Sequence, residues 1–121
     1  MIKIGKIELP HRPLLLAPME DVSDPPFRHL CKKYGADMLY TEFISADGLI
    51  RDADKSMKKL DIFDDERPVG IQIFGGDEEA MVRSAAIVEE ARPEVLDINY
   101  GCPVKNVVCR NAGSGILRDI D

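Results

Sequence analysis

The sequence predicts an α/β fold in which four parallel strands alternate with helices, preceded by a short β-hairpin. The short apolar run at residues 14–17 is typical of a strand that is buried on both faces, and residues 69–74 form a further strand with apolar residues on one face. Segments with helix-start signals and helical spacing of apolar residues separate these strands. No glycine fingerprint of the G-x-G-x-x-G kind follows the first strand, so a Rossmann fold is poorly supported.

The first half of the chain supplies two of the strands and a helix. Residues 1–10 alternate apolar and polar side chains around Gly5, which predicts the hairpin. Residues 14–17 form the first strand, which Pro18 ends. A helix begins after Ser23 and Asp24, which can cap its free N–H groups, and it ends at Gly35. Its predicted buried face consists of Phe27, Leu30, Cys31 and Tyr34.

The second half repeats the strand and helix pattern. Residues 38–41 form the second strand, and residues 44–60 carry a weak helical pattern with a charged, solvated surface. The third strand covers residues 69–74, with Ile71 and Ile73 on one face and Gln72 on the other. Asp77 caps the next helix, whose buried stripe is Met81, Ala85 and Val88. Residues 95–98 form the fourth strand.

Composition excludes several classes of protein. The chain has 121 residues, 45% of them apolar and 31% charged, as in ordinary globular proteins, and no apolar run of membrane-spanning length. Three cysteines without a C-x-x-C pair indicate free thiols, no metal site and a cytoplasmic location. The net charge of −6 argues against this chain binding RNA by itself.

The stretch Asp97-Ile98-Asn99-Tyr100-Gly101-Cys102-Pro103 has the character of a site. Asp97 and Asn99 alternate with Leu96 and Ile98, so both point to the opposite face of the fourth strand. Cys102 follows at the rim, between a flexible glycine and a rigid proline. The residues alone allow Cys102 to act as a nucleophile or as a general acid, since a free thiol is mostly protonated at neutral pH.

Three motifs resemble the signature of the tRNA-dihydrouridine synthases, in particular the bacterial B type. They are Asn-x-Gly-Cys-Pro at 99–103, followed by Lys105 and by Ala-Gly-Ser-Gly at 112–115; Ala-Pro-Met at 17–19; and Gln-Ile-Phe-Gly at 72–75. The resemblance implies a (β/α)8 TIM barrel, which needs about 250 residues. Residues 1–121 would then be the N-terminal half of the barrel's catalytic domain, without the C-terminal half and the helical RNA-binding domain of the family.

The resemblance also implies a chemistry. The family reduces uridine in tRNA to 5,6-dihydrouridine, with hydride from FMN that NADPH has reduced. Cys102 would be the general acid, and Pro18, Met19, Glu20, Gln72 and Asn99 would bind the flavin. Because the family's later flavin-binding loops lie beyond residue 121, we expect the chain alone to be inactive and to bind FMN weakly.

Two other functions fit parts of the sequence. An open four-stranded sheet has exposed edges, so two copies could associate into a non-catalytic half-barrel assembly. Another FMN-dependent TIM-barrel oxidoreductase, of the dihydroorotate dehydrogenase type, would share the barrel and the flavin. The Gly-Cys-Pro turn and the Gln-Ile-Phe-Gly motif argue against this second alternative.

Overall fold

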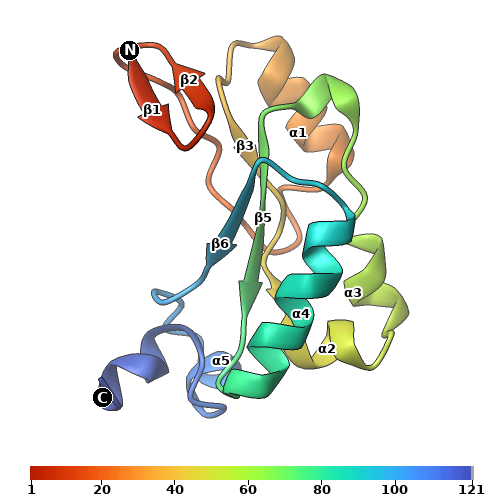
Figure 1. The fold of residues 1–121 in the computed structure, drawn as a ribbon, viewed down its shortest axis with the longest axis vertical. Helices are drawn as coiled ribbons and strands as arrows, with labels where there is room; N and C mark the ends of the chain where they lie inside the picture. The colour runs from red at the N-terminus through yellow and green to blue at the C-terminus, as the bar shows by residue number, and fades with distance from the viewer. Residues whose placement is uncertain (121) are drawn as a thin grey trace.

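The computed structural model describes residues 1–120 of the chain, and its N-terminal hairpin is as predicted. Strands β1 (Ile2–Ile4) and β2 (Ile7–Leu9) pair antiparallel, with Ile2 opposite Leu9. Gly5 makes the turn in the left-handed region, at a φ of 57°. The hairpin stands apart from the main sheet, at the end from which β3 and β5 start (Figure 1).

A parallel sheet centred on β5 (Val69–Phe74) carries the rest of the fold. Strand β6 (Val95–Ile98) pairs along one edge of β5, and β3 (Leu39–Tyr40) and β4 (Ile44–Ser45) pair along the other. Residues 14–16 add a single parallel bridge, Leu15 to Met38, beside β3. Strands that follow one another in the chain therefore lie side by side, as in part of a TIM barrel, which confirms the predicted fold class.

The second strand, predicted over residues 38–41, forms β3 and resumes as β4 after an interruption. Tyr40 pairs with Gly70 and Ile44 with Ile73, so three residues on this strand face two on β5. Residues 41–43 thus hold one extra residue, which is a β-bulge. The weak helical pattern predicted for 44–60 resolves into β4 and two short helices, α2 (Ala46–Ile50) and α3 (Asp54–Lys58).

The longer helices begin where the capping residues predict. The Asp24 side chain accepts a hydrogen bond from the Phe27 N–H at the start of α1 (Pro25–Lys33), and Asp77 accepts one from Ala80 at the start of α4 (Glu78–Glu90). The shorter elements are η1 (Asp64–Glu66), α5 (Lys105–Val108) and η2 (Gly113–Arg118). Figure 1 shows α2, α3 and α4 together on one side of the sheet.

The core lies between β5 and these helices. Ile71 and Ile73 are fully buried with Ile44, Leu49 and Val88, so the predicted alternation on the third strand is confirmed. On α4 the fully buried residues are Ala80, Ser84 and Val88, while the predicted Met81 and Ala85 are half-buried.

The prediction for the buried face of α1 is wrong. Leu30 and Tyr34 are 49% and 79% exposed, and the buried residue of the helix is Arg28. The Arg28 guanidinium donates to both carboxylate oxygens of Glu66, at 3.0 and 3.2 Å, and these contacts turn the charged face inward. Residues 14–17 were also expected to be buried on both faces, but Leu14 is 64% exposed because no strand among residues 1–120 pairs on its outer side.

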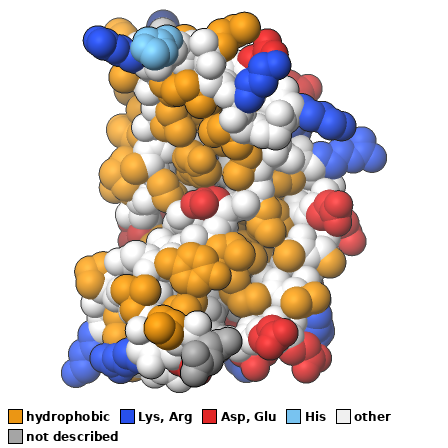
Figure 2. All heavy atoms as spheres, turned by 60° about the vertical axis from the view of Figure 1, so that its left-hand side comes forward, with side chains coloured by type: hydrophobic (Ala, Val, Ile, Leu, Met, Phe, Trp, Pro, Cys, Tyr) orange, Lys and Arg blue, Asp and Glu red, His pale blue; other side chains and the backbone are white. Residues whose placement is uncertain are grey.

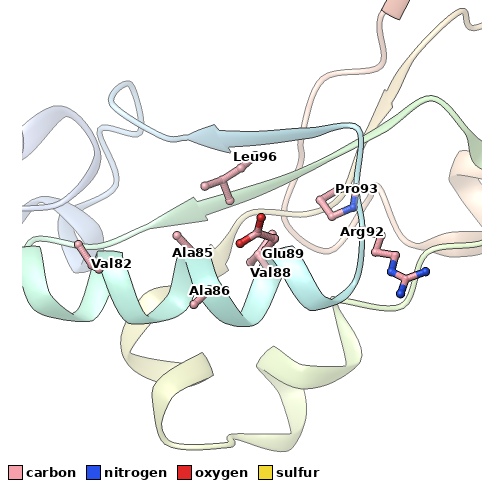
Figure 3. Close-up of a pocket in the computed structure, with 8 residues that line it drawn as sticks. All are labelled: Val82, Ala85, Ala86, Val88, Glu89, Arg92, Pro93 and Leu96. Atoms are coloured by element: carbon pink, nitrogen blue, oxygen red, sulfur yellow. The ribbon is translucent and has the colours of Figure 1, made fainter. Parts of the chain in front are cut away.

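An apolar surface covers the side of the molecule on which β6 lies (Figure 2). Leu96 and Ile98 of β6 are 39% and 38% exposed. Leu96 also lines an open groove of about 640 Å³ between α4 and β6, together with Val82, Ala85, Ala86, Val88, Glu89, Arg92 and Pro93 (Figure 3). None of the helices within residues 1–120 has the length and apolar character needed to cross a membrane.

Candidate active site

Polar side chains of β5 and β6 meet on the face of the sheet opposite to α4. Gln72 and Asp97 are paired in register on neighbouring strands, so their side chains lie next to each other. Ile71 and Ile73 on β5 point the other way, into the core. The groove in Figure 3 lies on that helical side, so it is distinct from this polar site.

Three side chains form a continuous line of hydrogen bonds, which we call the amide ladder: Asp97, Gln72 and Asn99. Gln72 Nε2 donates to Asp97 Oδ2 at 2.6 Å. Asn99 Nδ2 donates to Gln72 Oε1 at 3.0 Å. Asn99 Oδ1 then accepts from the backbone N–H of Cys102 at 2.9 Å and of Gly101 at 3.1 Å. The ladder joins the middle of the sheet to the turn that carries the thiol.

The Cys102 turn is held from its other side by the segment that follows α5. The Cys102 carbonyl accepts from Ser114 twice, from the backbone N–H and from Oγ, each at 3.0 Å. Gly113 has a φ of 54°, and a Cβ there would lie 2.7 Å from the Cys102 carbonyl oxygen. The group that approaches Gly113 closely is therefore the backbone of Cys102, and glycine leaves room for it.

Tyr40 closes the site on the β3 side. A Cβ at Gly70 would lie 2.6 Å from two carbons of the Tyr40 ring, so the ring lies directly over that glycine. Burial raises the pKa of the Tyr40 hydroxyl, and the charge of Asp97 raises this pKa further. The Asp97 carboxylate therefore lies close enough to the Tyr40 hydroxyl, on the same polar face, to disfavour its ionisation. The sequence marked Tyr40 only as part of a strand.

The loop with Pro18, Met19 and Glu20 follows residues 14–16 and lies at the same end of the parallel sheet as Cys102. Ser23, which is fully buried, accepts from the Met19 N–H at 2.8 Å and donates to the Met19 carbonyl at 3.0 Å. The backbone of Met19 is therefore already hydrogen-bonded within the loop. Pro18 and Met19 can contact a ligand only through their half-buried surfaces.

Glu20 forms an ion pair with Lys59, a residue that we predicted to lie on a solvated surface. Lys59 Nζ lies 2.7 and 2.8 Å from the two Glu20 carboxylate oxygens, and the Lys59 side chain is only 12% exposed. The helical pattern of residues 44–60 was too weak to show this inward position. Ser23 and Lys59 are thus two supporting residues that sequence reasoning missed.

Three carboxylates come together beside this loop. Oxygens of Glu20, Asp21 and Glu42 lie within 4.8 Å of one another. Glu20 is paired with Lys59, and Glu42 accepts from the Asp21 N–H at 2.6 Å. These protein partners account for Glu20 and Glu42, and the cluster by itself does not indicate a metal ion.

The hydrogen-bonding capacity of the ladder shows what it leaves for a ligand. Gln72 has two N–H donors and two acceptor positions, and the ladder uses one of each. Asn99 uses both acceptor positions on the Cys102 turn and keeps one N–H. The site therefore offers one acceptor and one donor from Gln72 and one donor from Asn99, beside the backbone turn that carries Cys102.

Comparison with known proteins places this site in a family. The dihydrouridine synthase family matches residues 15–121. The chain is 40% identical over 119 residues to tRNA-dihydrouridine synthase B of Pseudomonas aeruginosa, covering 98% of this chain and 36% of the relative. It is 39% identical over 120 residues to a probable tRNA-dihydrouridine synthase of Rickettsia prowazekii, with 98% and 36% covered.

A probable tRNA-dihydrouridine synthase of Aquifex aeolicus is 39% identical over 105 residues, with 86% of this chain and 33% of the relative covered. The chain spans about a third of the length of the curated relatives that it matches. The family match nevertheless extends over both motif-bearing strands, the amide ladder and the Cys102 turn. This chain therefore belongs to the dihydrouridine synthase family.

Proposed function

We propose that the protein carrying this chain reduces uridine in tRNA to 5,6-dihydrouridine, with Cys102 as the general acid. The observation that carries the proposal is the Cys102 turn. The turn is held by Asn99 on one side and by Ser114 on the other, at the end of a strand whose polar face is otherwise committed to the amide ladder. A thiol fixed in this way beside free amide groups suits delivery of a proton to a bound planar ring.

The residues present fit a flavin. The pyrimidine edge of a flavin alternates hydrogen-bond donors and acceptors, and Gln72 has one free group of each kind. Asn99 can offer only an N–H, so it would meet an acceptor atom of the flavin or of the uracil. Pro18 and Met19 would pack against the ring, and Glu20, fixed by Lys59, would border it. We take FMN as the flavin and NADPH as its reductant.

A bound reduced flavin would supply the hydride for C6 of the uracil. The Cys102 thiol gives its proton to C5, so the charge that develops there is neutralised as the C–H bond forms. The resulting thiolate recovers a proton from solvent. Asn99 keeps the thiol in place through the turn and directs its remaining N–H toward the bound rings.

The uridine must leave its base stack to reach this face of the sheet, as in other enzymes that act on bases. Residues 1–121 have a net charge of −6, so we propose that other parts of the protein supply most contacts to the tRNA backbone. In this proposal, residues 1–121 form part of a TIM-barrel catalytic domain rather than a complete unit.

The test is the dihydrouridine content of tRNA in cells that lack their own dihydrouridine synthases. The complete gene that carries this chain should restore 5,6-dihydrouridine, detected by mass spectrometry of digested tRNA. A protein that binds flavin and oxidises a free pyrimidine acid, yet leaves tRNA uridine unreduced, would instead be of the dihydroorotate dehydrogenase type.

A further inference from the structure

We propose that Asp97 is a positioning residue, whose carboxylate sets the direction of the amide ladder and thereby the hydrogen-bonding groups that Gln72 and Asn99 present to the flavin and the uracil. The proposal rests on the proposed function for the identity of these ligands. The ladder itself is a property of the folded chain and can be tested without them.

The two ends of the ladder have fixed polarity. An ionised carboxylate only accepts hydrogen bonds, so Asp97 requires the NH2 group of Gln72 to face it at 2.6 Å. The backbone N–H groups of Gly101 and Cys102 only donate, so they require the oxygen of Asn99 to face them. Both requirements select the same orientation of the two amides between them.

Reversal of the ladder would disturb the thiol. If Gln72 turned its amide over, its NH2 group would face Asn99, and Asn99 would have to turn as well. The NH2 group of Asn99 would then face the N–H groups of Gly101 and Cys102, donor against donor. The turn would lose two hydrogen bonds, and Asn99 would present an acceptor where it now presents a donor.

The surroundings of the ladder favour a rigid arrangement. Gln72 is only 6% exposed, so a lost partner is not readily replaced by water. The Tyr40 ring covers Gly70 on the neighbouring part of the face and lies close enough to Asp97 to respond to its charge. Within residues 1–120, no buried side-chain nitrogen or oxygen lacks a hydrogen-bond partner, so every buried polar atom of the ladder already has at least one.

Two variants of the complete gene product test this role through amide-proton exchange at Gly101 and Cys102, followed by NMR. Asp97→Ala frees Gln72, and exchange at both amides should become about tenfold faster, as expected for one hydrogen bond of ordinary net strength. The exchanged pair, Asp97→Asn with Gln72→Glu, should bring exchange back near the parent rate. In that pair the carboxylate at 72 accepts from the amides on both sides, so Asn99 keeps its orientation.

Glu94→Gln is the matched control. Glu94 is also a hydrogen-bonded carboxylate, accepting from the Val69 N–H at 2.8 Å, but it lies at the opposite end of β5. Its loss should leave exchange at Gly101 and Cys102 unchanged. Unchanged exchange in Asp97→Ala, or an exchanged pair that protects the turn no better than Asp97→Ala, would overturn the proposal. Should Asp97→Ala fail to fold, the exchanged pair is compared with the parent instead, and exchange at Gly101 and Cys102 well above the parent rate would overturn the proposal.

FMN affinity separates this proposal from the proposed function. Asp97→Ala should weaken FMN binding about tenfold, the loss of one ordered hydrogen bond. The exchanged pair should bind FMN weakly too, although its turn is intact, because a carboxylate at position 72 cannot donate to the flavin. Exchange that follows these predictions in a protein that neither binds FMN nor reduces tRNA would support the ladder and refute the proposed function.

Discussion

Breaking the ion pair between Arg28 and Glu66 should destabilise the fold more than any other loss of a charged contact. The two side chains are 2% and 1% exposed. The Arg28 guanidinium donates to Glu66, to the Ser23 carbonyl at 2.8 Å and to the Asp61 carbonyl at 3.0 Å. The pair thereby joins α1, η1, the loop before η1 and the turn that holds Met19.

The magnitude follows from burial. Glu66→Leu leaves the Arg28 charge inside the protein with only two carbonyl partners, and removes the acceptor of the Phe63 N–H. Removing one partner of a buried ion pair costs about 3–5 kcal/mol. The exposed pair of Lys3 and Glu8, at 67% and 51% exposure, is the control, and Glu8→Gln should cost less than about 1 kcal/mol.

Urea denaturation of the complete gene product measures these changes, provided that the slope against urea is unchanged. Arg28→Met combined with Glu66→Leu should cost less than the sum of the single changes by about 1–3 kcal/mol, because no buried charge is then left unpaired. The reasoning is refuted if Glu66→Leu costs no more than Glu8→Gln, or if the double change costs the full sum.

Three other predictions concern the candidate site. Gly113→Ala should destabilise the chain by about 1–2 kcal/mol for its left-handed backbone alone, and should change the alkylation rate of Cys102, since the new Cβ would lie 2.7 Å from the Cys102 carbonyl oxygen. An unchanged alkylation rate would contradict the contact. Gly70→Ala should cost about 1–3 kcal/mol in thermal or urea unfolding, because its Cβ would lie 2.6 Å from the Tyr40 ring. A neutral effect would show that the ring can move away. Tyr40 should ionise above the ordinary pKa of 10.0, so its contribution to stability is complete below pH 10.0 and is lost as the pH rises through the folded pKa. Tyrosinate absorbance followed during an alkaline titration should therefore contain a late component that Tyr40→Phe removes, and its persistence in that variant would exclude Tyr40 as the source.

Strong local signals predicted the parts of the fold that local physics controls. The alternation of Ile71 and Ile73 with Gln72 on β5, the cap at Asp77 and the cap at Asp24 predicted their elements correctly. The buried face of α1 could not be predicted in the same way. Leu30 and Tyr34 satisfy helical spacing, but the partner that turns Arg28 inward is Glu66 in η1, which lies far away in the sequence.

In the candidate site, too, local patterns predicted some features, and contacts between distant segments determined the others. Alternation along β6 placed Asp97 and Asn99 on one face, because strand geometry alone decides this. The register that brings Gln72 beside Asp97 depends on how two strands pair, which the sequence pattern of either strand does not determine. The amide ladder could therefore be found only in the structure. The bulge at 41–43 and the Lys59 partner of Glu20 likewise depend on contacts between segments far apart in the chain.

The most direct test of the central claim is the rate of uridine reduction in tRNA by the complete gene product with Cys102→Ala, compared with Cys109→Ala. Cys109 is an exposed thiol in the same part of the chain, so it controls for the general loss of a cysteine. Loss of a general acid predicts a rate about 10²–10⁴-fold lower for Cys102→Ala and a rate near that of the parent for Cys109→Ala. Equal rates in both variants, with flavin bound in each, would contradict Cys102 as the proton donor.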